Sequence, residues 1–216
     1  RSMVRVGRQM KKGMAALITD MNQPLGRMAG NALEVVESIE TLKGHGPDDL
    51  TDITVAFAVE MLVLAKKAKN RAAAEKTLRE LLANGKAFET FKEMVRLHGG
   101  DVATIDDPSR LPVAKIKQPI PASRSGFVAD VNAEAIGKAC VMLGAGRTKT
   151  DDAVDFAVGV SGIVKIGEKI NKGQPLIIVH ANSEEKLAEA NKLLATAFKI
   201  SASKVKTPKL ILDRIS

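Results

Sequence analysis

The chain contains 216 residues, 45% of them apolar, which is enough to bury one large core or two small ones. No apolar run approaches the ~20 residues that a membrane-spanning helix requires, so the sequence predicts a soluble globular protein. The single cysteine, Cys140, excludes an intramolecular disulfide and is compatible with a reducing compartment, so we expect a cytoplasmic protein. Cys140 falls within an apolar helical pattern and is expected to pack as a small hydrophobic residue.

The formal net charge of +8 is dispersed along the chain. Lysines and arginines at predicted helix ends have a structural explanation, because the helix dipole favours cations there. The chain has six Phe but no Tyr or Trp, which leaves few platforms on which single-stranded nucleic acid could stack. We therefore expect no nucleic-acid partner, and we attribute the charge to solubility or to a phosphorylated substrate.

The first predicted strand covers residues 14–18, an apolar run that is too short for a helix. A turn around Pro24 prevents the strand from continuing, and this pattern is typical of a strand buried on both faces of a parallel sheet. A helix is expected to begin at Asn31, which would cap it while Glu34 reaches back to a free backbone donor. Gly44 is placed to end that helix.

Three more helices are expected in the first half of the chain, at residues 50–68, 71–83 and 86–98. The first of these is apolar nearly all round, which predicts a helix enclosed by protein.

A segment without periodicity, residues 101–112, contains Pro108 and Pro112 and marks the predicted domain boundary. We expect one domain over residues 1–105 and a second over residues 111–216. The first residue is Arg rather than Met, and residues 1–12 have no helix cap, which suggests a chain cut from a longer one.

After the boundary, the pattern changes to short strands punctuated by Pro and Gly, interrupted by helices. The expected strands begin with residues 115–120 and 126–131. The expected helices cover residues 133–143, with Asn132 as the cap, and residues 184–198.

Several features have both a structural and a functional interpretation. Residues 144–147 (GAGR) could form a phosphate-binding turn, but they lack its strand and helix context, and two glycines favour a chain reversal. Residues 162–179 share the strand-and-turn sequence pattern of biotinyl and lipoyl carrier domains, whose modified lysine is exposed. Lys165 is instead expected inside a strand, in the alternation of its side chains between Val164 and Ile166. Three histidines lack a second ligand at metal spacing: His45, His98 and His180.

Two blocks of sequence resemble one known family. The first block is ALITDMNQPLG followed by GNALEV at residues 16–35, and the second comprises DFAVG, GIVKIG, GQPL and VHAN between residues 155 and 182. In this order the blocks resemble the pyrimidine-nucleoside phosphorylase and thymidine phosphorylase family, over about residues 4–215 and only its C-terminal half. The resemblance implies an α/β fold: a truncated part of the large parallel-sheet α/β domain, followed by an α+β C-terminal domain that is hammerhead or barrel-like.

The resemblance also implies an activity. Members of the family split uridine, deoxyuridine or thymidine with phosphate to give the free base and a pentose 1-phosphate, and the parent enzyme would be a homodimer active in nucleoside salvage. The reaction depends on positioning and electrostatics and needs no covalent nucleophile. Because the family's phosphate-binding loop and base-binding residues correspond to positions upstream of Arg1, we expect no catalytic residue in this chain and no activity from it alone. The VHAN block implies a hydrogen-bonding role for His180 at a strand end.

The same resemblance implies a structural potassium ion. Matching QPLG and GNALEV to the family assigns two backbone carbonyl ligands to Leu25 and Met28 and a carboxylate ligand to Glu37, with the other ligands outside this chain. Oxygen donors of this kind suit a hard cation. The alternative is that Glu37 is a solvated helix charge, like Glu34 and Glu40.

Two other classes of function stay open. The chain could be a stand-alone, non-enzymatic binding module derived from a phosphorylase. It could also be a carrier or a basic nucleic-acid module, which mass added at Lys165 or salt-sensitive DNA binding would reveal.

Overall fold

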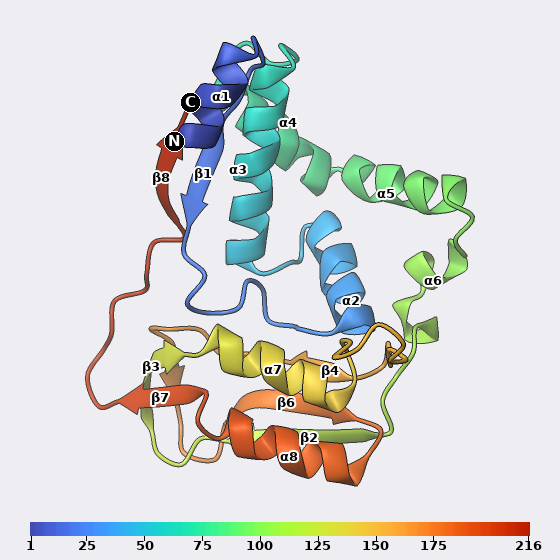
Figure 1. Ribbon diagram of the computed structural model, residues 1–216, viewed down its shortest axis with the longest axis vertical. Helices are drawn as coiled ribbons and strands as arrows, with labels where there is room; N and C mark the ends of the chain where they lie inside the picture. The colour runs from blue at the N-terminus through green and yellow to red at the C-terminus, as the bar shows by residue number, and fades with distance from the viewer. The chain divides into compact units, whose positions relative to one another are not determined.

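The structure is a computed structural model that describes residues 1–216 (Figure 1). It consists of two units, each built from segments that are separate in the sequence. The first unit contains Arg1–Asp20, Glu40–Met94 and Lys209–Ser216, and the second contains Met21–Ile39 and Val95–Pro208. These units do not follow the predicted limits at residues 105 and 111. Whether residues 1–105 and 111–216 are independent folding domains stays a prediction.

The sheet of the first unit has two strands, β1 (Ala16–Thr19) and β8 (Ile211–Ile215), which pair antiparallel. The predicted strand exists, but the predicted parallel sheet was wrong, because every strand pair in the structure is antiparallel. Ile18 is 44% exposed, so the strand is not buried on both faces either. A short apolar run predicts an extended, partly covered segment but does not specify the direction of its partner.

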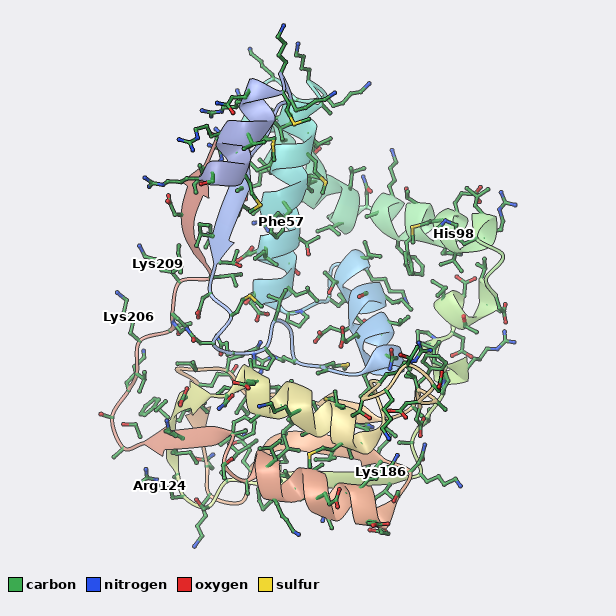
Figure 2. All side chains as sticks on the ribbon, viewed as in Figure 1. Phe57, His98, Arg124, Lys186, Lys206 and Lys209 are labelled. Carbon is green, nitrogen blue, oxygen red and sulfur yellow. The ribbon has the colours of Figure 1, made fainter.

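Four helices lie wholly or largely in the first unit: α1 (Ser2–Gln9), α3 (Asp48–Leu64), α4 (Arg71–Ala83) and α5 (Lys86–Leu97). One face of α3 packs on α4 through Val55, Val59 and Ala74. The prediction that this helix is enclosed was wrong, since Phe57, seen on α3 in Figure 2, is 43% exposed and Met61 is 67% exposed. The apolar cluster that α3 shares with α4 covers only one of its faces.

A buried carboxylate links three elements of this unit. Glu60 on α3 accepts hydrogen bonds from Arg71 Nε on α4 at 3.0 Å and from Arg214 Nε and Nη2 on β8 at 2.6 and 2.7 Å. The paired contact with Arg214 has the planar geometry that makes guanidinium–carboxylate bonds strong. Glu60 is therefore neutralised where it is buried, and it ties the β8 strand to the helices.

The second unit contains two three-stranded antiparallel sheets, in the orders β2-β6-β4 and β5-β3-β7. Their strands are β2 (Ile116–Pro121), β3 (Gly126–Val131), β4 (Gly159–Ser161), β5 (Lys169–Ile170), β6 (Pro175–Ala181) and β7 (Phe198–Ser201). The long helices are α7 (Ala133–Leu143) and α8 (Glu184–Leu194), which pack against each other, with α7 against β4 and α8 against β6 (Figure 1). A short helix, α6 (Ala103–Asp106), and a 3₁₀ turn (Pro108–Arg110) precede them.

One continuous apolar core holds this unit together, with Val128, Ile136, Val160 and Leu194 all fully buried. The caps agree with the sequence: Asn132 accepts a hydrogen bond from Ala135 N at 3.0 Å. The mixture of helices and strands agrees with an α/β protein, and no helix is long and apolar enough to cross a membrane.

The helix predicted over residues 184–198 ends earlier, at Leu194. Phe198 instead begins β7 and pairs with Val131 of β3. At this end of the predicted helix, pairing with a neighbouring strand determines the conformation, and the helical spacing of the apolar residues does not.

Candidate functional site

The loop that follows β1, residues 23–29, belongs to the second unit and runs against residues 160–168 of the same unit. Ala29 and Val160 exchange two backbone hydrogen bonds, of 2.9 Å from Ala29 N and 2.7 Å from Val160 N. Ile163 N donates to Arg27 O at 3.0 Å. The loop is thus held by backbone pairing although it is not part of a sheet.

The helix α2 (Asn31–Leu42) begins directly after this loop. Glu34 Oε1 accepts from Gly30 N at 2.9 Å, so the expected backward reach of Glu34 is confirmed. The cap itself differs from the prediction, because Glu34 N donates to Gly30 O, which makes Gly30 the cap. Asn31 Nδ2 instead donates to Ala145 O at 2.8 Å.

Glu37, on the same helix, is directed at the loop. It is only 6% exposed, and its Oε1 accepts a hydrogen bond from Arg27 N at 2.7 Å. A Cβ atom at Gly26, where φ is +67°, would lie 2.1 Å from Glu37 Oε2, so the loop carries glycine where the carboxylate approaches it. The alternative that Glu37 is a solvated helix charge was wrong, because helical spacing does not show which side of a helix a loop will cover.

Arg27 connects the loop to residues 163–168. Its Nη1 donates to Ile163 O at 3.1 Å, and both terminal nitrogens donate to the Glu168 carboxylate. Partial burial acts to raise the pKa of Glu168, but the hydrogen bonds from Arg27 and from Lys165 N, together with the charges of Arg27 and Lys165, outweigh it and lower that pKa below its usual value. Glu168 is therefore ionised and fully engaged near neutral pH.

Lys165 makes the next contact with the loop. Its side chain is almost completely buried, and Nζ donates to Pro24 O at 2.5 Å. The neighbouring Ile166 N donates to Gln23 Oε1 at 3.0 Å. Lys165 lies in the irregular connection between β4 and β5, so its predicted place in strand alternation was wrong. A buried amine bonded to a carbonyl also differs from the exposed lysine of a carrier domain.

The structure brings the three predicted cation ligands into one neighbourhood. Leu25 and Met28 flank Gly26 and Arg27, the loop residues that the Glu37 carboxylate approaches. Leu25 is 41% exposed, and because its side chain carries no donor atom, only its carbonyl oxygen could serve as a ligand. No group of three or more His, Cys, Asp or Glu side chains is placed to hold a metal ion. A cation here would therefore depend on backbone carbonyl groups plus Glu37, and such oxygen donors fit a hard cation. Potassium binding itself stays a prediction.

Other residues singled out in the sequence have structural roles. Cys140 is buried, which together with the charge of Glu34 raises the pKa of its thiol to about 12, as expected for a packed residue. Gly144 ends α7 with a φ of +106°, in agreement with a chain reversal. His180 Nε2 lies 2.8 Å from Ser161 Oγ, which confirms the expected hydrogen bond, and burial with the charge of Lys117 lowers the His180 pKa.

Replacing Glu37 with alanine is expected to lower the free energy of unfolding by about 1–3 kcal/mol, because the Arg27 amide would lose its partner in a buried place. Urea unfolding in potassium-free buffer measures this. The matched control is Glu40→Ala, which removes a carboxylate that is 42% exposed and pairs only with Lys43 and His45 at 3.6 Å. That control should cost less than about 1 kcal/mol, and equal losses for the two variants would contradict the assignment.

The sequence did not predict the contacts of Arg27, Lys165 and Glu168, and it singled out Lys165 only as a possible carrier lysine. Arg27 and Glu168 are 141 positions apart, and neither stands in a pattern that predicts the other. The only local signal was the pair Lys165 and Glu168, three residues apart around Gly167.

Known proteins of one family match both the N-terminal and the C-terminal part of the chain. A family model described as the Pyrimidine nucleoside phosphorylase C-terminal domain matches residues 127–201, and one described as the Glycosyl transferase family, a/b domain, matches residues 1–88. The chain is 43% identical over 213 residues to a pyrimidine-nucleoside phosphorylase of Bacillus subtilis, covering 98% of the chain and 48% of the relative. It is 38% identical over 216 residues to the one of Geobacillus stearothermophilus, covering 100% and 50%.

A Staphylococcus aureus protein with the same name is 44% identical over 184 residues, which is 85% of the chain and 42% of the relative. The chain thus spans about half the length of the curated relatives it matches. Two family models in the expected order, together with identity that extends from one end of the chain to the other, place it in the pyrimidine-nucleoside phosphorylase family.

Proposed function

We propose that this chain is the C-terminal half of a pyrimidine-nucleoside phosphorylase, a pentosyltransferase that splits uridine, deoxyuridine or thymidine with phosphate. The observation that carries the proposal is the 38–44% identity to proteins of that name over most or all of the chain. By itself the chain is inactive, since the family's phosphate-binding and base-binding segments have no counterpart in it. The whole protein is a homodimer, as the family resemblance implies, and it is cytoplasmic, as the single cysteine suggests.

The proposed reaction is a substitution at the anomeric carbon of the pentose. A phosphate oxygen forms a bond to that carbon while the bond to the pyrimidine nitrogen breaks, and the base leaves with the electron pair and takes up a proton. The protein positions phosphate and stabilises the negative charge that grows on the base. The chain described here contributes the loop after β1 and the unit that holds it.

We also propose that Glu37 and the backbone carbonyl groups of Leu25 and Met28 hold a potassium ion, with further ligands from outside the chain. The burial of Glu37 against this loop supports the proposal. When bound, the ion would supply a fixed positive charge that stabilises the loop conformation. The second unit, with two three-stranded sheets around one core, is compatible with a hammerhead or barrel-like description, which we propose for it.

An assay of the full product of the gene tests the proposal. We expect uridine, deoxyuridine or thymidine to yield free base only when phosphate is present, with one pentose 1-phosphate formed for each base released. Base release without phosphate would indicate a hydrolase. A full gene product that begins at this chain and has no activity would favour a stand-alone binding module.

A further inference from the structure

The loop at residues 23–29 belongs by sequence to the a/b domain match at residues 1–88, but residues 160–168, inside the C-terminal domain match, hold it in place. The loop and this segment both lie within the second unit. In this chain, the part that matches the C-terminal domain model therefore supports a loop in the part that matches the a/b domain model.

The contacts run in register along the loop and in the opposite direction along the segment. They join residue 23 to 166, residue 24 to 165, residue 27 to 163 and residue 29 to 160. Between the second and third contact lie Leu25 and Gly26, and Gly26 is the position that faces the Glu37 carboxylate. The segment thus holds both sides of the part of the loop that Glu37 approaches.

Glu168 and Lys165 are the two charged side chains of the segment that perform this task. Glu168 accepts from both terminal nitrogens of Arg27 and from Lys165 N at 2.9 Å. The Lys165 ammonium donates to Pro24 O, the carbonyl group that immediately precedes Leu25 in the chain. It therefore fixes the orientation of the peptide group that joins Pro24 to Leu25.

We propose that Lys165 and Glu168 are positioning residues for the cation site, holding the loop so that the carbonyl groups of Leu25 and Met28 face Glu37. The inference rests on the proposed function, because it concerns the potassium ion proposed there. It adds a role for residues 160–168, which would influence the affinity of that ion without supplying a ligand to it.

Because Lys165 is positively charged, the direction in which its replacement changes potassium affinity tests the proposal. If this ammonium acted only through its charge, it would repel a nearby potassium ion, and Lys165→Met would tighten potassium binding. If it positions the loop, the same change releases the Pro24 carbonyl group and weakens binding. Glu168→Gln keeps the size of the side chain and removes the charge that holds Arg27.

The experiment uses the full gene product, which would carry the complete set of ligands, and measures hydrogen–deuterium exchange at the amides of Arg27 and Ala29, first in tetramethylammonium chloride and then during titration with potassium chloride. We expect Lys165→Met and Glu168→Gln to speed exchange about tenfold or more, and to raise the potassium concentration for half-maximal protection by a similar factor. The control variants, Lys169→Met and Glu185→Gln, replace exposed residues of the same unit and should match the unaltered chain.

Three results would overturn the proposal. Exchange that is unchanged in both variants would show that these residues do not hold the loop. Faster exchange with unaltered or tighter potassium binding would show that the loop shape does not set the site. No potassium response from the unaltered full gene product would overturn the cation site together with this proposal, whereas the proposed phosphorolysis, assayed on the same protein, would stand.

Discussion

The 216-residue chain is expected to release no uracil or thymine from uridine or thymidine in phosphate buffer at any rate above the uncatalysed one. The family resemblance implies that the residues that bind phosphate and base correspond to positions upstream of Arg1. Holding two reactants in place raises their effective concentration roughly 10⁵-fold or more, and a chain without the binding segments loses this whole contribution to the rate. Liquid chromatography of the reaction mixture with equal amounts of this chain and of the full gene product measures the difference.

Addition of potassium chloride should not restore activity to the chain, because the proposed cation would stabilise a loop and would not bind the substrates. The full gene product serves as the positive control in the same buffers. Turnover by the chain within about a hundredfold of that control would show that catalytic groups lie within these residues, and it would overturn the assignment of the reaction centre to the other half.

The elements with strong local signals were predictable from sequence. Helix α7 matches its prediction at both ends because Asn132 caps its start and Gly144, in a left-handed conformation, ends it. Helix α4 likewise begins after Asn70, whose side chain accepts from Ala73 N, and ends before Asn84. In these cases the residues that define the ends lie within a turn of the backbone groups they satisfy.

The support of the candidate site was not predictable in the same way. Glu37 stands one turn beyond Glu34 on α2, and helical spacing alone does not distinguish its buried carboxylate from the exposed one of Glu34. Burial follows from the loop at residues 23–29, and that loop is fixed by Lys165 and Glu168 far along the chain. Contacts over 136–143 positions leave no periodic trace in one sequence.

The family resemblance supplied what the local pattern could not. It assigned Leu25, Met28 and Glu37 to one neighbourhood, and the structure places Glu37 against the loop that carries the other two. It gave no indication of Arg27, Lys165 or Glu168. The ligands of a site and the residues that hold them thus require different kinds of information.

Gly159 is the position in the second unit where an added methyl group would come closest to another part of the backbone, and we expect the largest loss of stability from a single methyl group there. A Cβ atom there would lie 2.2 Å from Ala29 O and 2.9 Å from Gly30 Cα, and the φ of Gly159 is +149°. Because the obstructing atoms are backbone, no side chain can rotate away to relieve the contact. Gly159→Ala should therefore lower the free energy of unfolding by about 2–6 kcal/mol, from overpacking and from the positive φ together.

The control that separates these two causes is Gly173→Ala, since Gly173 also has a positive φ, of +84°, but no atom lies within 4 Å of the added Cβ. Urea unfolding of both variants measures the difference, and the excess loss at Gly159 reports the collision together with any additional strain from its larger φ. Hydrogen–deuterium exchange at the Ala29 and Val160 amides should be faster in Gly159→Ala, because their two hydrogen bonds, of 2.9 and 2.7 Å, join the loop to β4 next to Gly159. Equal losses for the two glycine variants would mean that the loop can move away from β4, and Lys165 and Glu168 would then hold a loop with more freedom than the structure indicates.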